Sequence, residues 1–201
     1  MKNLFYTFVL LIFQINAHAQ SNGPKDNFVV KIREEEGDLN KDGIKDKVLI
    51  MMDTVNETVP LKLKIYLSQH KKKPTLFFAS TRIIEPMYPV YRKGLPNEYQ
   101  IPYFFIEDGY LKMISETAGG QAEHRFRFIN GNFELIYFSK STWDGKNTTT
   151  LTEFNLISGW RTEITQGLGS EKILTKKKSK SLIRPLPKIQ TFKPFEKNYI
   201  N

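Results

Sequence analysis

The chain has 201 residues, with 30 Lys and Arg against 21 Asp and Glu, a formal net charge of +9 and no cysteine. This length suits one domain with a sizeable core. The absence of cysteine excludes disulfides, thiol nucleophiles, thiolate metal sites and a lipid-modified N-terminal cysteine. The positive charge favours an anionic partner such as a polysaccharide, a lipid headgroup or an acidic protein.

The N-terminus, residues 1–19, has the pattern of a secretory signal peptide. Lys2 precedes an apolar run over residues 4–13, and Ala17 and Ala19 supply the small residues that a signal peptidase requires. The run is too short to span a bilayer, which disfavours the alternative of an uncleaved anchor. We therefore expect cleavage after Ala19, a periplasmic or secreted protein, and no membrane span in the mature chain. Export also disfavours nucleic acid as a partner.

Residues 37–50, GDLNKDGIKDKVLI, combine several oxygen-bearing side chains with glycine and then become strongly apolar. Calcium takes six to eight oxygen ligands at about 2.3–2.6 Å, and a short loop supplies them from alternate positions. The candidate ligands at positions one, three, five, seven and nine are Asp38, Asn40, Asp42, the Ile44 carbonyl and Asp46. Gly43 at position six permits a sharp turn. The loop 38–46 therefore predicts a calcium site, and the alternative is a polar Asx-rich turn before a strand.

This loop departs from an EF-hand, which needs a bidentate Glu at position twelve and flanking helices. Position twelve is Leu49, and the segment that follows reads as a strand. The segment resembles the Asp-x-Asn-x-Asp-Gly-x-x-Asp calcium loop of FG-GAP (integrin-like) repeats, which leads directly into a β-strand. The resemblance implies calcium ligation by the same five residues. Lys41 and Lys45, at even positions, point away from the ion but reduce its affinity by charge repulsion.

Alternation of apolar and polar residues predicts an all-β fold. The segment LKLKIYL, residues 61–67, has the period of two that is typical of a half-buried strand. Asn-Gly and Asp-Gly pairs between apolar runs predict hairpins, because these residues tolerate the positive φ of a type I′ turn. The pairs are Asn130-Gly131, Asp108-Gly109 and Asp144-Gly145. Additional strands are expected over residues 28–32, 47–52 and 76–84. Little helix is expected, and the strands should form an antiparallel meander or hairpin sandwich, or a partial propeller-like sheet.

Prolines make residues 85–102 an irregular loop of a length that often carries function. Its aromatic residues Tyr88, Tyr91 and Tyr99 are typical of an interface or a carbohydrate-contacting loop. The alternative is that they cap one end of the sandwich.

The chain is expected to form a single β domain over residues 20–170. The C-terminal residues 171–201 are basic and contain proline, and we expect them to pack weakly or to run along the surface. Lysines cluster at residues 71–73 and 176–180. These clusters are either a binding surface for an anionic partner or a solvated turn and tail.

The sequence predicts no catalytic and no cofactor-binding residues other than the calcium ligands. It contains no G-x-S-x-G, H-E-x-x-H or P-loop motif. His124 alternates in phase with Phe126 and Phe128, which favours a core histidine over a catalytic base. Glu116 and Glu123 are candidates for a glycosidase-type carboxylate pair, although a structural or solvated role is favoured.

A second resemblance extends over more of the chain. The order of a signal peptide, GDLNKDGIKDKVLI, GYLKMISETAGG, HRFRFINGNFELIYF and LTEFNLISGW is similar to uncharacterised secreted β-proteins of Bacteroidetes-type bacteria and to periplasmic lysozyme-inhibitor-like proteins with one such calcium loop. No inhibitory residue can be transferred, because no motif beyond the loop matches.

From these observations we expect an exported, calcium-binding β-protein of the bacterial envelope. It should be a monomer that acts as a binding, inhibitor or accessory protein for an envelope enzyme or an anionic glycan. The alternatives are a hydrolase acting on envelope polysaccharide and a structural surface protein.

Overall fold

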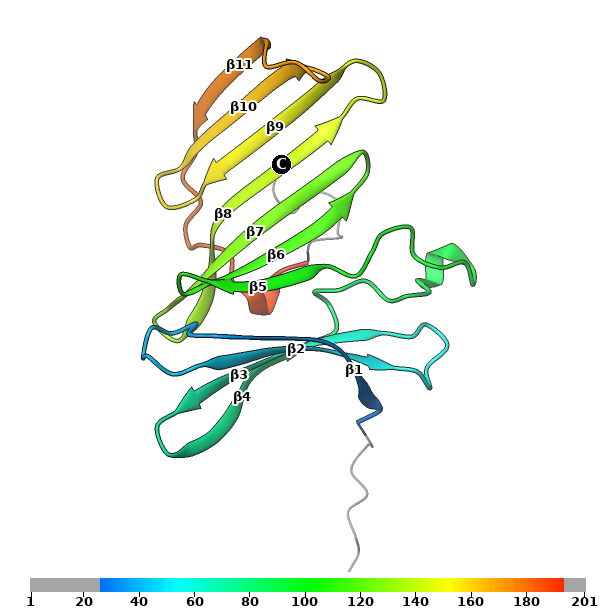
Figure 1. Cartoon of the computed structure of the whole chain (residues 1–201), viewed down its shortest axis with the longest axis vertical. Coiled ribbons are helices and arrows are strands. Elements are labelled where there is room, and N and C mark those ends of the chain that lie inside the picture. Colours follow the sequence, from blue (N-terminus) through cyan, green and yellow to red (C-terminus); the bar gives the residue numbers. More distant parts are fainter. Residues whose placement is uncertain (1–25, 194–201) are drawn as a thin grey trace, which may run out of the picture.

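The computed structural model describes residues 26–193, so the predicted signal peptide lies outside the described residues. Two antiparallel sheets make up the fold (Figure 1). The four-stranded sheet has the order β1 (Phe28–Gly37), β2 (Asp46–Asp53), β3 (Leu61–Gln69) and β4 (Lys72–Ser80). The seven-stranded sheet is a meander of β5 (Tyr103–Glu107), β6 (Tyr110–Thr117), β7 (Gly120–Ile129), β8 (Asn132–Trp143), β9 (Thr148–Asn155), β10 (Trp160–Gly167) and β11 (Ile173–Lys180). The predicted all-β antiparallel fold class is confirmed.

The predicted hairpins are present, and two of them have the expected turn. Asn130 and Gly131 have φ angles of 48° and 73°, and Asp108 and Gly109 have φ angles of 54° and 75°. These values fit type I′ turns, whose twist matches that of the flanking strands. The third hairpin differs, because residues 144–147 form a longer turn between β8 and β9.

The strand predicted over residues 76–84 is wrong at both ends. Strand β4 begins earlier, at Lys72, and ends at Ser80, whose hydroxyl accepts a hydrogen bond from the Arg82 amide at 3.0 Å. Ile83 and Ile84 are nevertheless buried, since they reach the core from an irregular segment. Their apolar character reflects core packing and not membership of the strand.

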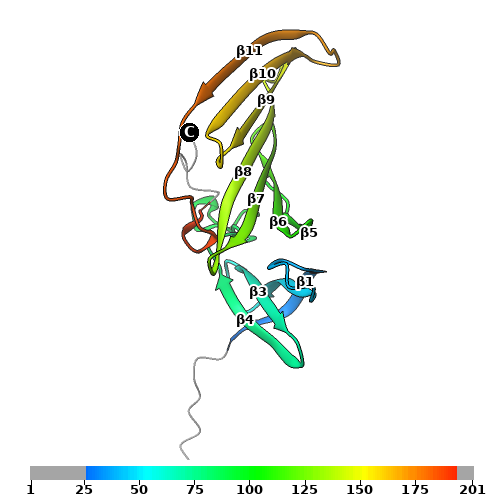
Figure 2. The ribbon, with the colours of Figure 1, turned by 90° about the vertical axis from the view of Figure 1, so that its left-hand side faces the viewer.

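The two sheets share one core, and the first sheet lies across the lower end of the second in Figure 1. Val48, Ile50 and Leu63 from the first sheet belong to the same buried cluster as residues of β5–β9. Phe77 on β4 makes edge-to-face contacts with the rings of Phe128 and Phe133, at centroid distances of 5.4 and 5.5 Å. The strands β9–β11 extend beyond the first sheet (Figures 1 and 2). Part of the larger sheet is therefore left open to solvent.

The C-terminal segment contributes both to the sheet and to the core. Strand β11 pairs with β10, and all of its residues are exposed. A lysine-rich edge strand discourages pairing with other chains. The chain then returns to the core, where Ile189 and Phe192 are buried, and η2 (Ile189–Thr191) packs on β8. The expected boundary at residue 171 falls between β10 and β11. No helix within residues 26–193 is long and apolar enough to cross a membrane.

Candidate functional site

The predicted calcium loop connects β1 to β2 and is held by its own side chains. Asp38 accepts hydrogen bonds from the amides of Asp42 and Gly43, at 3.1 and 2.8 Å. The Asp42 carboxylate accepts one from the Ile44 amide at 2.8 Å, and the Asn40 side-chain oxygen accepts one from the Asp42 amide at 3.1 Å. The structure therefore brings the oxygen-bearing side chains of the pattern together in one compact turn.

Asp46 differs from these residues because it is completely buried. Its two carboxylate oxygens accept hydrogen bonds from the amides of Leu39 and Ser68, both at 2.8 Å. Burial raises the pKa of Asp46, the two hydrogen bonds oppose this shift, and the negative charges of Asp42 and Asp38 raise the pKa further. Asp46 therefore ties the loop to β3 while it lies near the other two carboxylates.

The donor chemistry of the loop fits calcium, since all of the predicted side-chain ligands are oxygen donors. A carboxylate oxygen that accepts one backbone hydrogen bond retains a second lone pair for a metal. However, Asp42 also accepts a hydrogen bond from the Asn40 amide group at 3.0 Å. Within residues 26–193 there is no group of three or more His, Cys, Asp or Glu side chains able to hold a metal ion. Calcium ligation therefore stays a prediction from the loop pattern.

The loop also contacts the second sheet. The Lys41 ammonium lies 5.4 Å from the centre of the Tyr110 ring. A Cβ atom added to Gly109 would lie 2.4 Å from Cε of Lys41, so the flexible lysine side chain would have to move. At the end of β1, a Cβ on Gly37 would similarly meet Ile106 at 2.5 Å. The conformation of this loop therefore contributes to the packing where the two sheets meet.

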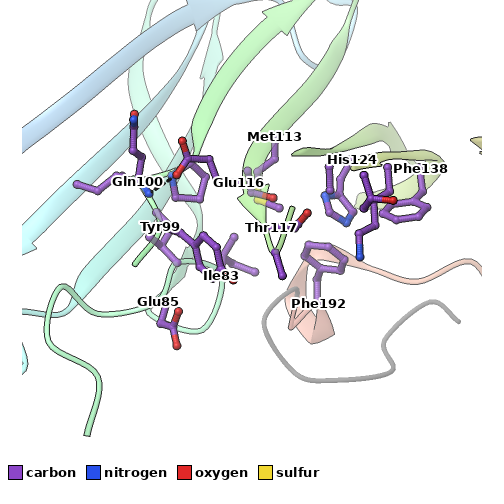
Figure 3. A pocket seen from close by; sticks show the side chains of 18 of the residues that line it. Ile83, Glu85, Tyr99, Gln100, Met113, Glu116, Thr117, His124, Phe138 and Phe192 are labelled. Atoms are coloured by element: carbon purple, nitrogen blue, oxygen red, sulfur yellow. Dashed lines mark hydrogen bonds between the residues drawn. The ribbon is translucent and has the colours of Figure 1, made fainter. Parts of the chain in front are cut away.

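A hollow of about 740 Å³ lies on one face of the second sheet (Figure 3). The C-terminal segment follows this face (Figure 2), and its Phe192 lines the hollow. This volume falls in the usual range for small-ligand sites. Its floor consists of the core side chains Met113, Ala122, His124, Phe138 and Phe192. Its wall on β8–β10 is polar and consists of Lys140, Thr142, Thr150, Thr152, Arg161 and Glu163.

The polar wall follows from the strand register, because directly opposed residues on neighbouring strands share a face. Lys140 is opposite Thr152, and Thr152 is opposite Glu163. Thr150 and Thr165 are opposed in the next row, where their hydroxyl oxygens are 3.1 Å apart. Hydroxyl groups and charges from three strands therefore face the same space.

The irregular loop predicted over residues 85–102 forms the opposite rim, where Tyr99 and Glu85 lie across from His124 (Figure 3). The Glu85 carboxylate accepts hydrogen bonds from the Tyr91 hydroxyl at 2.7 Å and from the Asn97 side chain at 3.0 Å. Tyr88, Tyr91 and Tyr99 are exposed. The loop is thus fixed by its own hydrogen bonds while it presents aromatic rings to solvent.

Glu116 and Glu123 are already engaged with other groups. Glu116 lies at the rim, where it accepts a hydrogen bond from the Gln100 amide at 2.9 Å. Glu123 pairs with Arg125. Because its neighbours Ala122 and His124 line the hollow, Glu123 points to the other face of the sheet.

His124 is buried in the floor of the hollow, where its ring lies 5.0 Å from that of Phe138 and 4.9 Å from that of Phe192. Its Nδ1 atom has no hydrogen-bond partner among the described residues. Burial lowers the pKa of His124 to about 3. The imidazole is therefore neutral at physiological pH.

Replacing His124 with Phe should remove a pH-dependent loss of stability. Above pH 6.5 the histidine is neutral in both the folded and the unfolded chain. At lower pH it binds a proton in the unfolded chain, whereas in the folded chain it stays neutral until the pH falls to its pKa of about 3. The wild-type protein should therefore lose about 1.4 kcal/mol of unfolding free energy per pH unit relative to the variant. Urea denaturation at pH 7.5, 6 and 5 measures this difference. Parallel profiles would contradict the prediction, and His70→Phe, at an exposed position, is the control.

The sequence did not single out Lys140, Thr152 or Arg161. The available signal was the alternation in TTTLTEFN and WRTEITQG, which predicts strands but does not show which face is used. Comparisons with family models, with curated proteins and with solved structures found no match for this chain.

Proposed function

We propose that this chain is an exported, calcium-binding β-protein of the bacterial envelope that binds a segment of an envelope glycan as an accessory or inhibitory protein. The observation that carries the proposal is the hollow on the second sheet, which combines a polar wall, an apolar floor and an aromatic rim. The parts of the proposal that concern export and calcium binding rest on the sequence pattern alone.

The lining of the hollow has the chemistry that a sugar requires. Sugar rings present hydroxyl groups at their edges, which side-chain hydroxyls, amides and charged groups bind, and apolar faces that pack on aromatic rings. Thr142, Thr150 and Thr152 supply hydroxyls on the wall. Tyr91 and Tyr99 supply aromatic rings on the rim.

The proposal assigns binding and not turnover to this site. Glu85 and Glu116, the carboxylates at the rim, hold the irregular loop through hydrogen bonds. The imidazole of His124 lies between aromatic rings in the floor. A general acid and a general base for glycoside hydrolysis would instead need carboxyl groups directed at one bond of the substrate.

Calorimetry of residues 20–201 with soluble cell-wall glycan fragments tests the proposal, with chromatography of the fragments after incubation. We expect saturable binding without cleavage, and a several-fold weaker affinity for Thr152→Val, which removes one hydroxyl from the wall. Thr149→Val is the matched control, since Thr149 lies on the same strand and faces away from the lining residue Thr150.

Other outcomes of this experiment would overturn the glycan assignment in distinct ways. Cleavage of the fragments would make the protein a hydrolase. Stoichiometric inhibition of a muramidase without glycan binding would identify an envelope enzyme as the partner.

A further inference from the structure

We infer that the glycan segment bound in the hollow is acidic, and that Lys140 and Arg161 bind its anionic group. This inference rests on the proposed glycan binding and adds the chemical class of the ligand. It is separate from the lysine clusters at residues 71–73 and 176–180, which lie outside the hollow.

Lys140 on β8 and Arg161 on β10 line the same wall and are only partly exposed. No residue in the described part of the chain forms an ion pair or a side-chain hydrogen bond with either of them. A partly buried cation without a partner loses part of its hydration and gains no ion pair or hydrogen bond in return. An anion that enters the hollow would supply the missing partner to both groups.

Three other partly buried cations of this protein have partners, whereas Nε of the partly buried Arg127 has none among the described residues. Lys62 and Lys64 both bind the Asp26 carboxylate, at 2.9 and 3.1 Å. Arg33 donates to the carbonyl oxygens of Ile101 and Pro102, at 2.8 and 2.7 Å. Lys140 and Arg161 differ from these three because they form no ion pair, although the carboxylates of Glu85, Glu116 and Glu163 also line the hollow.

The register places a hydroxyl group between the two cations. Lys140 is opposite Thr152, while Arg161 is opposite Phe154, two residues further along β9 on the same face. An ammonium, a hydroxyl and a guanidinium group thus line one part of the wall, and all three donate to an oxyanion. Glu163, the acidic residue of this wall, lies 3.8 Å from Lys177 on the neighbouring edge strand, which partly offsets its charge.

Two glycans that differ in one carboxylate test this inference. Peptide-free wall strands of alternating N-acetylglucosamine and N-acetylmuramic acid carry a lactyl carboxylate on every second sugar, and chitooligosaccharides of the same length do not. We expect the acidic strand to bind at least about tenfold more tightly at physiological salt. Lys140→Gln or Arg161→Gln should remove this preference and leave chitooligosaccharide binding within about twofold, whereas Arg161→Lys should retain part of it.

Two substitutions in the same sheet serve as controls. Glu163→Gln should retain or strengthen binding of the acidic strand, because it removes a like charge beside the anion. Lys176→Gln changes the net charge as Lys140→Gln does, but Lys176 is exposed and lies opposite Ile164 on the other face of the sheet, so it should have less than about a twofold effect.

The outcomes separate the two proposals. If both glycans bind with equal affinity and Thr152→Val still weakens binding, the inference that the ligand is acidic is overturned, but the proposed glycan-binding function is retained. An equal loss for Lys176→Gln and Lys140→Gln would also overturn the inference, since it would show a non-specific effect of charge. Failure of both glycans to bind would overturn the proposed function itself.

Discussion

Asp46→Ala should lower the free energy of unfolding by about 2–6 kcal/mol, in the presence of a chelator as well as in calcium. The Asp46 carboxylate is completely buried and accepts hydrogen bonds from the amides of Leu39 and Ser68. Its removal leaves two buried N–H groups without acceptors, at about 1–3 kcal/mol each. Urea denaturation in chelator isolates this structural contribution from any contribution of a bound metal.

Asp42→Ala is the matched variant for the predicted calcium site. Asp42 is exposed, so in chelator the variant should lose little of its free energy of unfolding. In calcium it should lack the stabilisation that the metal gives to the wild-type protein. For the wild-type protein that stabilisation is about 2.7 kcal/mol at a hundredfold excess over Kd. Lys41→Ala should retain the calcium response, and magnesium should substitute poorly because it demands a tighter octahedral site.

Two results would contradict these expectations separately. A melting curve that does not change from micromolar to millimolar calcium would make residues 38–46 a polar turn without a metal. A loss for Asp46→Ala in chelator that is no larger than the loss for Asp42→Ala would refute the structural role of the buried carboxylate.

Phe192→Ala should lower the free energy of unfolding by about 3–5 kcal/mol, as expected for truncation of a buried aromatic side chain. The Phe192 ring is 1% exposed and lies 4.9 Å from His124 and 5.1 Å from Phe126, measured between ring centres. Leu182→Ala, in the same C-terminal segment but exposed, is the control and should change stability by less than about 0.5 kcal/mol. Equal small losses for both variants would show that this segment contributes little to the core.

The Phe192 variant also links the C-terminal segment to the proposed site. Phe192 forms part of the floor of the hollow, so its truncation should weaken glycan binding even under conditions where the variant is folded. The basic, proline-containing composition of this segment indicated a surface tail and gave no sign of this anchoring role.

The sequence alone determined the features that depend on neighbouring residues. Alternation over residues 61–67 predicted a half-buried strand, and Asn130-Gly131 and Asp108-Gly109 predicted type I′ hairpins, because side-chain period and positive φ are local properties. It also located the oxygen-rich turn at residues 38–46. The Asp144-Gly145 hairpin was found for the same reason, although its longer turn was not foreseen.

Only the tertiary structure decided which residues share a space. Asp46 appears in the sequence as one more loop carboxylate, and its burial depends on Ser68, which lies on another strand. Lys140, Thr152 and Arg161 meet because of the register across β8, β9 and β10, and a shift of one residue in any of these strands would turn its side chain to the opposite face. The local pattern does not specify that register or which face is covered by the core, so the hollow and its unpaired cations emerge only when the strands are assembled.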